Sequence, residues 1–183
     1  MTREEAYKLL NANLKNNNLI KHSLAVEAIM KGLAVKLGEN IDKFGLAGLL
    51  HDIDYEFTAK EPSKHSIIGA DMLKEAGVEE EIVHAVLTHN DYHGIERETV
   101  LDKALFCADP VSGLITAAAL IRPEKKLACV TVEFLKKKYA DKAFAKGANR
   151  ETMKACADID LTLEELFEVS LEAMQSISDE LGL

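Results

Sequence analysis

The sequence predicts an all-α fold, and two features indicate it. Hydrophobic residues make up 48% of the 183-residue chain, and most of them are Ala, Leu, Ile and Val, whereas aromatic residues contribute 5%. Only 3 prolines interrupt the chain, and apolar residues recur at helical spacing along most of it. We therefore expect a globular multi-helix bundle that forms a single domain over residues 1–183.

A capping box predicts the first helix. Thr2 is followed three residues later by Glu5, and this pair of side chains can satisfy two free helix N–H groups. The helix should run to about Asn13, because the asparagines at residues 16–18 then break the helical pattern.

The second predicted helix carries an inward-facing histidine. It runs from about Leu19 to Leu37, and Gly38 suits the position just past its end. Its apolar stripe includes Val26, and His22 lies four residues earlier on the same face. We therefore expect His22 to point into the core.

A third helix should end at a pair of polar residues. It is predicted from about Asp42 to His51, with Asp52 directly after it. A histidine beside an aspartate at the end of an apolar helix contributes poorly to a core and suits the binding of a cation. Taken alone, the histidine also fits a helix C-terminus, where the helix dipole favours positive charge.

Two further helices each place one histidine on a buried face. The first is predicted from Ser63 to Glu75 and has His65 in line with its apolar residues. The second is predicted from Val78 to Asn90, and the helical period separates its two histidines. His89 falls on the apolar side, whereas His84 falls on the polar side and should face water.

The next helix brings a carboxylate to a predicted bend. It runs from about Thr99 to Asp109, and Pro110 follows directly. Because a proline pushes the residue before it away from helical angles, we expect the backbone to bend there before a new helical segment over residues 111–121. A bend beside a half-buried carboxylate indicates a functional site.

The C-terminal part is predicted to be a helical extension, over about residues 123–183, of a helical core at about residues 19–121. Basic residues are concentrated between residues 125 and 150, where two helices are expected. Thr162 forms a second capping box with Glu165 and opens a final helix to about Leu181. The strongest strand signal, at residues 128–132, is short and lies in helical surroundings.

Composition also limits partners and location. The net charge is −9 and no long basic stripe compensates it, so we expect no nucleic-acid polymer as a partner, whereas a small anionic substrate is compatible with a cation in the site. The sequence has no apolar run of membrane-spanning length and no secretory signal, so we expect a cytoplasmic protein without membrane contact. The sequence is also compatible with a homo-oligomer. The 3 cysteines are widely spaced and should be reduced thiols.

Six residues combine ligand chemistry with an inward direction, and they form the predicted metal site. They are His22, His51, Asp52, His65, His89 and Asp109. Imidazole and carboxylate without thiolate suit Fe, Mn, Co, Ni, Zn or Mg, and the sequence does not choose among these metals. Six ligands exceed what one catalytic ion takes while leaving an open position, so we expect two ions with Asp52 bridging them. Any one of the histidines alone would also fit a hydrogen-bonded core residue, but the set favours metal.

This pattern resembles the HD-domain superfamily of metal-dependent phosphohydrolases, and its nearest branch is the HDIG-type predicted hydrolases. Two of the six residues, His65 and His89, match the extra histidines of binuclear members. The other four match the shared motif in order and are His22, His51, Asp52 and Asp109. The resemblance implies hydrolysis of a small phosphorylated metabolite, a nucleotide, through a metal-activated water, with His51 and Asp52 as catalytic residues.

Two other functions remain open at this point. Some HD-fold proteins with the same four histidines and two aspartates resemble mixed-valent di-iron oxygenases that cleave C–C or C–P bonds. Alternatively, the metal site could belong to a non-catalytic nucleotide-sensing module, which predicts stabilisation by ligand without turnover.

Two positions depart from the superfamily pattern. Asp54 stands where a glycine often follows His-Asp-Ile, and Asn90 stands where binuclear members often complete a His-His pair. Asp54 and Glu56 could hydrogen-bond a ligand histidine, relay protons, or lie in a solvated acidic loop.

Substrate-binding candidates lie beside one ligand and in the basic segment. Asn90 and His93 follow His89 closely and are placed to line the mouth of a site. Positive side chains in an acidic protein would complement an anionic substrate. These basic candidates are Arg122, Lys125, Lys126, Lys146 and Arg150, whereas the run at residues 136–138 should be a solvated face.

Overall fold

The computed structural model describes all 183 residues, and it contains helices and no strands, so the all-α prediction is confirmed. In chain order the α-helices are α1 (Arg3–Asn13), α2 (Asn17–Leu37), α3 (Ile41–Leu50), α4 (Tyr55–Thr58), α5 (Ile67–Glu75), α6 (Glu80–Thr88), α7 (Val100–Leu120), α8 (Val132–Ala140), α9 (Arg150–Lys154), α10 (Leu163–Ser176) and α11 (Ser178–Leu181). Short 3-10 helices lie at Asp91–His93, Leu127–Cys129 and Ala155–Ile159.

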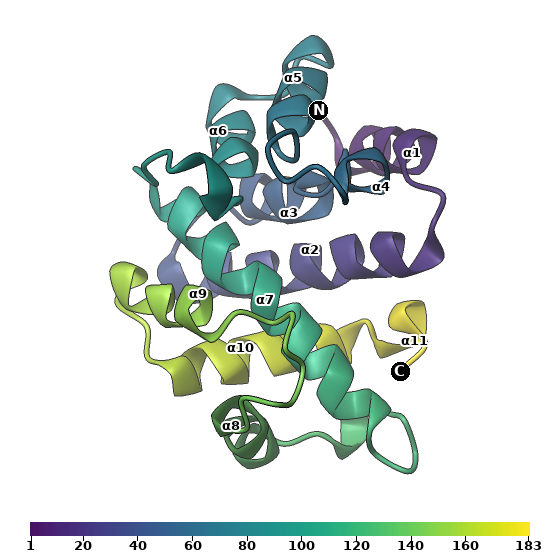
Figure 1. Cartoon of the computed structure of the whole chain (residues 1–183), viewed down its shortest axis with the longest axis vertical. Helices are drawn as coiled ribbons and strands as arrows, with labels where there is room; N and C mark the ends of the chain where they lie inside the picture. Colours follow the sequence, from purple (N-terminus) through teal and green to yellow (C-terminus); the bar gives the residue numbers. More distant parts are fainter.

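The two longest helices, α2 and α7, have 21 residues each and organise the bundle. Figure 1 shows α1 and α3 to α6 on one side of α2, and α8, α10 and α11 on the other, with α7 crossing between them. One apolar core of 45 buried residues joins both sides. Helix α7 is long and apolar enough to span a membrane. However, 61% of its most apolar 18-residue stretch is buried inside this core, which is typical of the central helix of a bundle.

The predicted capping residues act as expected. Thr2 and Thr162 each accept a hydrogen bond from the backbone N–H three residues on, and each glutamate at that position bonds back to the threonine N–H. Gly38 ends α2 in the left-handed conformation with a φ of 73°, which a residue with a side chain adopts less readily.

The predicted bend at Pro110 is wrong, because α7 continues through it. Pro110 has no N–H to bond the carbonyl of Phe106, which would weaken an isolated helix at this point. Here the residues on both sides of the proline are buried in the core, and this packing outweighs the local preference. These buried residues include Leu105, Ala108, Val111 and Leu114.

The predicted start of α5 at Ser63 is also wrong. Residues 62–66 form turns, Ser66 has a φ of 68°, and the helix begins at Ile67. His65 therefore lies in a turn and is not held by helical geometry. The predicted final helix is divided as well, since α10 ends at Ser176 and a separate turn of helix, α11, follows it.

Candidate metal centre

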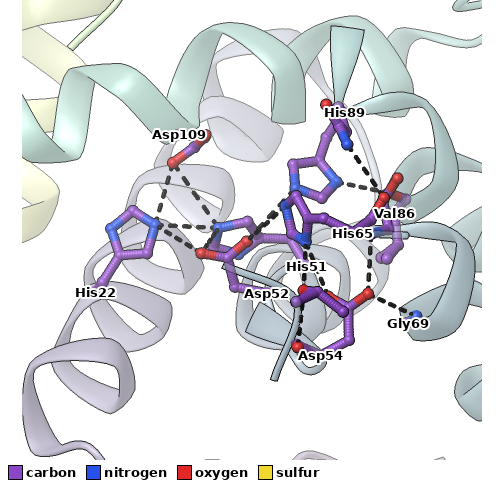
Figure 2. A network of polar contacts seen from close by, with 12 residues as sticks. His22, His51, Asp52, Asp54, His65, Gly69, Val86, His89 and Asp109 are labelled. Atoms are coloured by element: carbon purple, nitrogen blue, oxygen red, sulfur yellow. Dashed lines mark hydrogen bonds and ion pairs between the residues drawn. The ribbon is translucent and has the colours of Figure 1, made fainter. Parts of the chain in front are cut away.

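The structure brings the six predicted ligand residues together from five parts of the fold (Figure 2). Two of them, His51 and His89, are the C-cap residues of α3 and α6. His22 lies near the start of α2 and Asp109 in the middle of α7. The remaining two come from turns, Asp52 directly after His51 and His65 before α5.

One set of donor atoms gathers between α2, α3 and α7. His22 Nε2 lies 3.1 Å from His51 Nε2 and 3.1 Å from Asp109 Oδ1. Asp52 Oδ2 lies 3.5 Å from His22 Nε2 and 3.4 Å from His51 Nε2. The donor atoms of His22, His51 and Asp52 all lie within 4.8 Å of one another, and Asp109 joins this set through its contact with His22.

A second set gathers around the other oxygen of the same carboxylate. Asp52 Oδ1 lies 3.4 Å from His65 Nε2 and 3.5 Å from His89 Nε2. The rings of His65 and His89 meet edge to face, with their centroids 5.0 Å apart. Asp52 therefore presents one oxygen to each set of donors.

The spacing of the donors fits the coordination of metal ions. Two ligands about 2.1 Å from one ion lie about 3.0 Å apart at a right angle and about 3.4 Å apart at a tetrahedral angle. The observed separations between donors run from 3.1 to 3.5 Å, except that His51 Nε2 and Asp109 Oδ1 lie 3.8 Å apart. Both sets can thus hold an ion without rearrangement of the backbone.

Backbone carbonyls orient two of the histidines. His51 Nδ1 donates to Gly48 O at 2.8 Å, and His89 Nδ1 donates to Val86 O at 2.5 Å. A carbonyl oxygen can only accept, so Nδ1 of each ring carries the proton. In the neutral form of each ring, the lone pair of Nε2 is then free and points into the centre.

Side chains orient the other two histidines in the same way. His65 Nδ1 donates to Asp54 Oδ1 at 2.9 Å. His22 Nδ1 donates to Ser112 Oγ at 3.0 Å, because the Ser112 hydroxyl proton is committed to Asp109 O at 2.8 Å. All four histidines therefore share one tautomer, the arrangement in which an outer hydrogen bond prepares a metal ligand.

Asp54 is a buried part of this arrangement and does not lie in a solvated loop. Its side chain is fully buried, and Oδ2 accepts hydrogen bonds from Ser66 N and Gly69 N, both at 2.9 Å. A Cβ at Gly69 would lie 3.3 Å from the Asp54 carboxyl carbon, so a larger residue there would have to displace the Asp54 side chain by a few tenths of an ångström. Glu56 does not contact the ligand histidines. Its carboxylate accepts hydrogen bonds from backbone N–H groups in the connection between α1 and α2.

The electrostatics of the centre favour positive charge. Burial lowers the pKa of His51, but Asp52 and Asp109 outweigh this effect and raise the pKa to about 9. Burial raises the pKa of Asp52, yet the neighbouring histidines hold it well below its usual range. The pKa of Asp109 is lowered for the same reason, chiefly by His22. Two ionised carboxylates in a largely buried position attract a cation.

A pocket of about 470 Å³ opens onto both donor sets. Its apolar walls include Leu19 and Phe106, and Asn149 and Thr152 from the C-terminal segment line it as well. No lysine or arginine lines this pocket. Any phosphate bound there would depend on metal ions for its counter-charge.

The two predicted mouth residues hold the turn that carries His65. Asn90 Nδ2 donates to Pro62 O at 3.0 Å and to His65 O at 3.1 Å, and Asn90 also lines the pocket. His93 Nε2 donates to His65 O at 2.8 Å and does not line the pocket. His84, predicted to face water, is 30% exposed, lies outside the centre and donates to buried Asp102 at 3.0 Å.

The five basic candidates lie outside the pocket. The guanidinium of Arg150 donates to backbone carbonyls of residues 138–148, and that of Arg122 stacks on Phe134, 5.1 Å from the ring centroid. Lys125 and Lys126 are exposed in the turn that follows α7. Lys146 lines a separate hollow next to the pocket.

Some residues of the centre were not predicted from the sequence. Ser112 follows Asp109 by three residues on α7, so helical spacing could have placed it beside the ligand. Asn149 and Thr152 carry no local signal, because only the packing of α9 against α7 brings them to the pocket (Figure 1).

Known proteins are similar to this chain in sequence. The family model described as HD domain matches residues 19–142. Ribonuclease Y of Lawsonia intracellularis is 37% identical over 103 residues, which cover 56% of this chain and 20% of that protein. Ribonuclease Y of Fervidobacterium nodosum is 35% identical over 141 residues, covering 73% and 26%, and that of Thermotoga maritima is 33% identical over 141 residues, covering 73% and 27%. The chain thus spans about a fifth to a quarter of the length of these relatives.

The expectation that no nucleic-acid polymer is a partner is wrong. The relatives that overturn it are named as ribonucleases, which act on RNA. The expectation failed because a net charge averages over the whole chain, whereas binding of a polyanion depends on where the basic residues lie.

Proposed function

Since the chain belongs to the HD domain family and is a metal-dependent hydrolase, we propose that it hydrolyses phosphodiester bonds of RNA with two metal ions held by the six ligand residues. The observation that carries this proposal is the bridging position of Asp52, which offers Oδ2 to one donor set and Oδ1 to the other. Ions bound in these sets would polarise the phosphoryl oxygens and lower the pKa of a water.

The side chains of the centre are already oriented for metal binding in the absence of substrate. Four outer hydrogen bonds hold the imidazoles in the tautomer that can bind metal, so no proton has to move between ring nitrogens. Asp109 is the most exposed of the ligand carboxylates, at 36%, and it faces the pocket. It is therefore the carboxylate that can hydrogen-bond a water or a substrate hydroxyl.

RNA is supported by the names of the relatives and by the shape of the pocket. The relatives named Ribonuclease Y share 33–37% identity with this chain over 103 to 141 residues. The pocket of about 470 Å³ can take a nucleotide, with apolar walls for a base and with Asn149 and Thr152 for hydrogen bonds.

The direct test uses a fluorescent single-stranded RNA and the DNA of the same sequence, each incubated with Mn²⁺ in the absence of oxygen. We expect RNA cleavage by the wild-type protein, loss of cleavage in His51→Ala, and retention in His84→Ala, which removes a histidine outside the centre. Intact RNA together with hydrolysis of mononucleotides would reject the proposed substrate. The same incubations are repeated in air, and turnover that appears only there would reject hydrolysis in favour of the oxygenase alternative.

A further inference from the structure

A short segment concentrates positive charge in this acidic protein. Residues 136–154 contain seven basic and two acidic residues and carry a net charge of +5, so the rest of the chain carries −14. The segment comprises the end of α8, the connection that follows it and α9. Figure 1 shows this connection running back from α8 toward α7, on which the metal centre depends.

This segment forms a hollow of about 620 Å³ beside the metal pocket. Lys142, Lys146 and Lys154 line the hollow, and so does Tyr139, whose ring also meets that of Phe167 edge to face with the centroids 5.5 Å apart. The two cavities share a wall at residues 147–149. The hollow therefore lies directly beside the metal pocket. We call it the basic hollow and define it by Tyr139, Lys142, Lys146 and Lys154.

Two of the lysines are available for a ligand. Lys154 pairs with Glu151 at 2.8 Å, whereas neither Lys142 nor Lys146 has a carboxylate within 4.0 Å. Arg150 keeps the shared wall in place, because it donates to the carbonyls of Ala145 and Ala148 at 2.7 and 2.6 Å. The lysines thus project from a wall that is fixed by the interior hydrogen bonds of Arg150.

We propose that the basic hollow binds the phosphates of an RNA strand next to the bond cleaved at the metal centre, an inference that rests on the proposed function. Lys142 and Lys146 neutralise two phosphates, and the ring of Tyr139 provides a surface for stacking of a base. A positively charged groove with an aromatic side chain is the arrangement that binds single strands. The acidic remainder of the surface repels the strand and so directs it along this path.

The test measures binding of a fluorescent single-stranded RNA by anisotropy in EDTA, so that metal and cleavage play no part. We expect the charge reversal Lys142→Glu with Lys146→Glu to weaken binding at least 10-fold. The slope of log affinity against log salt concentration should become shallower by about 1.4, since each phosphate contact on a single strand contributes about 0.7. The matched control is Lys125→Glu with Lys126→Glu, an equal change of charge beyond the end of α7, which should leave binding nearly unchanged.

Three results would overturn the inference. Binding that is unaffected by the first pair would show that the hollow is not used, and an equal loss with both pairs would show an effect of net charge alone. A polyglutamate chain that binds as tightly as RNA would show a surface for acidic proteins instead of nucleic acid. Failure of the proposed function is a separate result, because it appears as intact RNA after incubation with metal whatever the lysine variants do to binding.

Discussion

Replacing Asp54 by Asn should weaken the half of the metal centre that contains His65, while the fold is retained. Oδ2 of Asp54 accepts two backbone N–H groups and Oδ1 accepts the His65 Nδ1 proton. An asparagine can keep its oxygen on the two backbone donors only by turning its amide NH₂ group toward His65. That donor favours the opposite tautomer, in which His65 Nε2 carries the proton and cannot bind metal.

The magnitude follows from the number of bonds that change. Loss of an outer hydrogen bond to a ligand typically weakens metal affinity 10- to 100-fold, or about 1.4–2.7 kcal/mol. The metal-free protein should lose about 1.5–3 kcal/mol of stability, because the buried carboxylate that accepts the His65 proton is replaced by a neutral amide. The two backbone bonds to Asp54 remain, so a larger loss is not expected.

Isothermal titration of metal-free protein with Mn²⁺ measures the affinity, and urea unfolding in EDTA measures the stability. Asp71→Asn is the matched control. It is the same substitution of aspartate by asparagine, but Asp71 is exposed on α5 and lies away from the centre. His65→Ala combined with Asp54→Asn should be no weaker in metal binding than His65→Ala alone, since both act through one ring. Unchanged affinity in Asp54→Asn would refute the assigned role of Asp54.

Further predictions concern the other ligands and the pH dependence of stability. Ser112→Ala removes the acceptor of His22 Nδ1 and should weaken metal binding about 10-fold in the same titration; equal affinity would contradict this. Protein with metal at 100 times its Kd should be stabilised by about 2.7 kcal/mol and melt roughly 5–11 °C above protein in EDTA, and identical melting curves would argue against a metal centre. Hydrogen bonds with Thr162 and the charge of Lys36 lower the pKa of Glu165 to about 2, below the unfolded value near 4.5, so this carboxylate stabilises the fold above pH 4.5 and loses that effect as the pH falls toward 2. Glu165→Gln should therefore lose less stability than wild type between pH 5 and pH 2.5 in thermal melts, and a parallel loss would contradict the assignment.

The sequence predicted the all-α class and the inward direction of several ligands, because both depend on local spacing. His22 and His89 lie on helices whose apolar period extends to them, and the structure places both in the centre. His65 reaches the centre for another reason. It sits in a turn whose position depends on the hydrogen bonds of buried Asp54, a contact between residues 11 apart that helical periodicity does not describe.

The remaining differences come from long-range packing. Pro110 should have bent α7, but burial on both sides of it keeps the helix continuous. Asn149 and Thr152 line the pocket only because α9 packs against α7. The basic segment could be identified in the sequence, whereas the wall it shares with the metal pocket could not, because that wall requires the full path of the chain from α8 to α9.

The number of metal ions bound per chain tests the central claim most directly. Elemental analysis of protein loaded with Mn²⁺ and freed of excess metal should give two ions per chain for the wild type, one for His65→Ala, and close to none for Asp52→Ala, because Asp52 serves both donor sets. A single ion in the wild type that persists in His65→Ala would contradict the bridged two-ion centre.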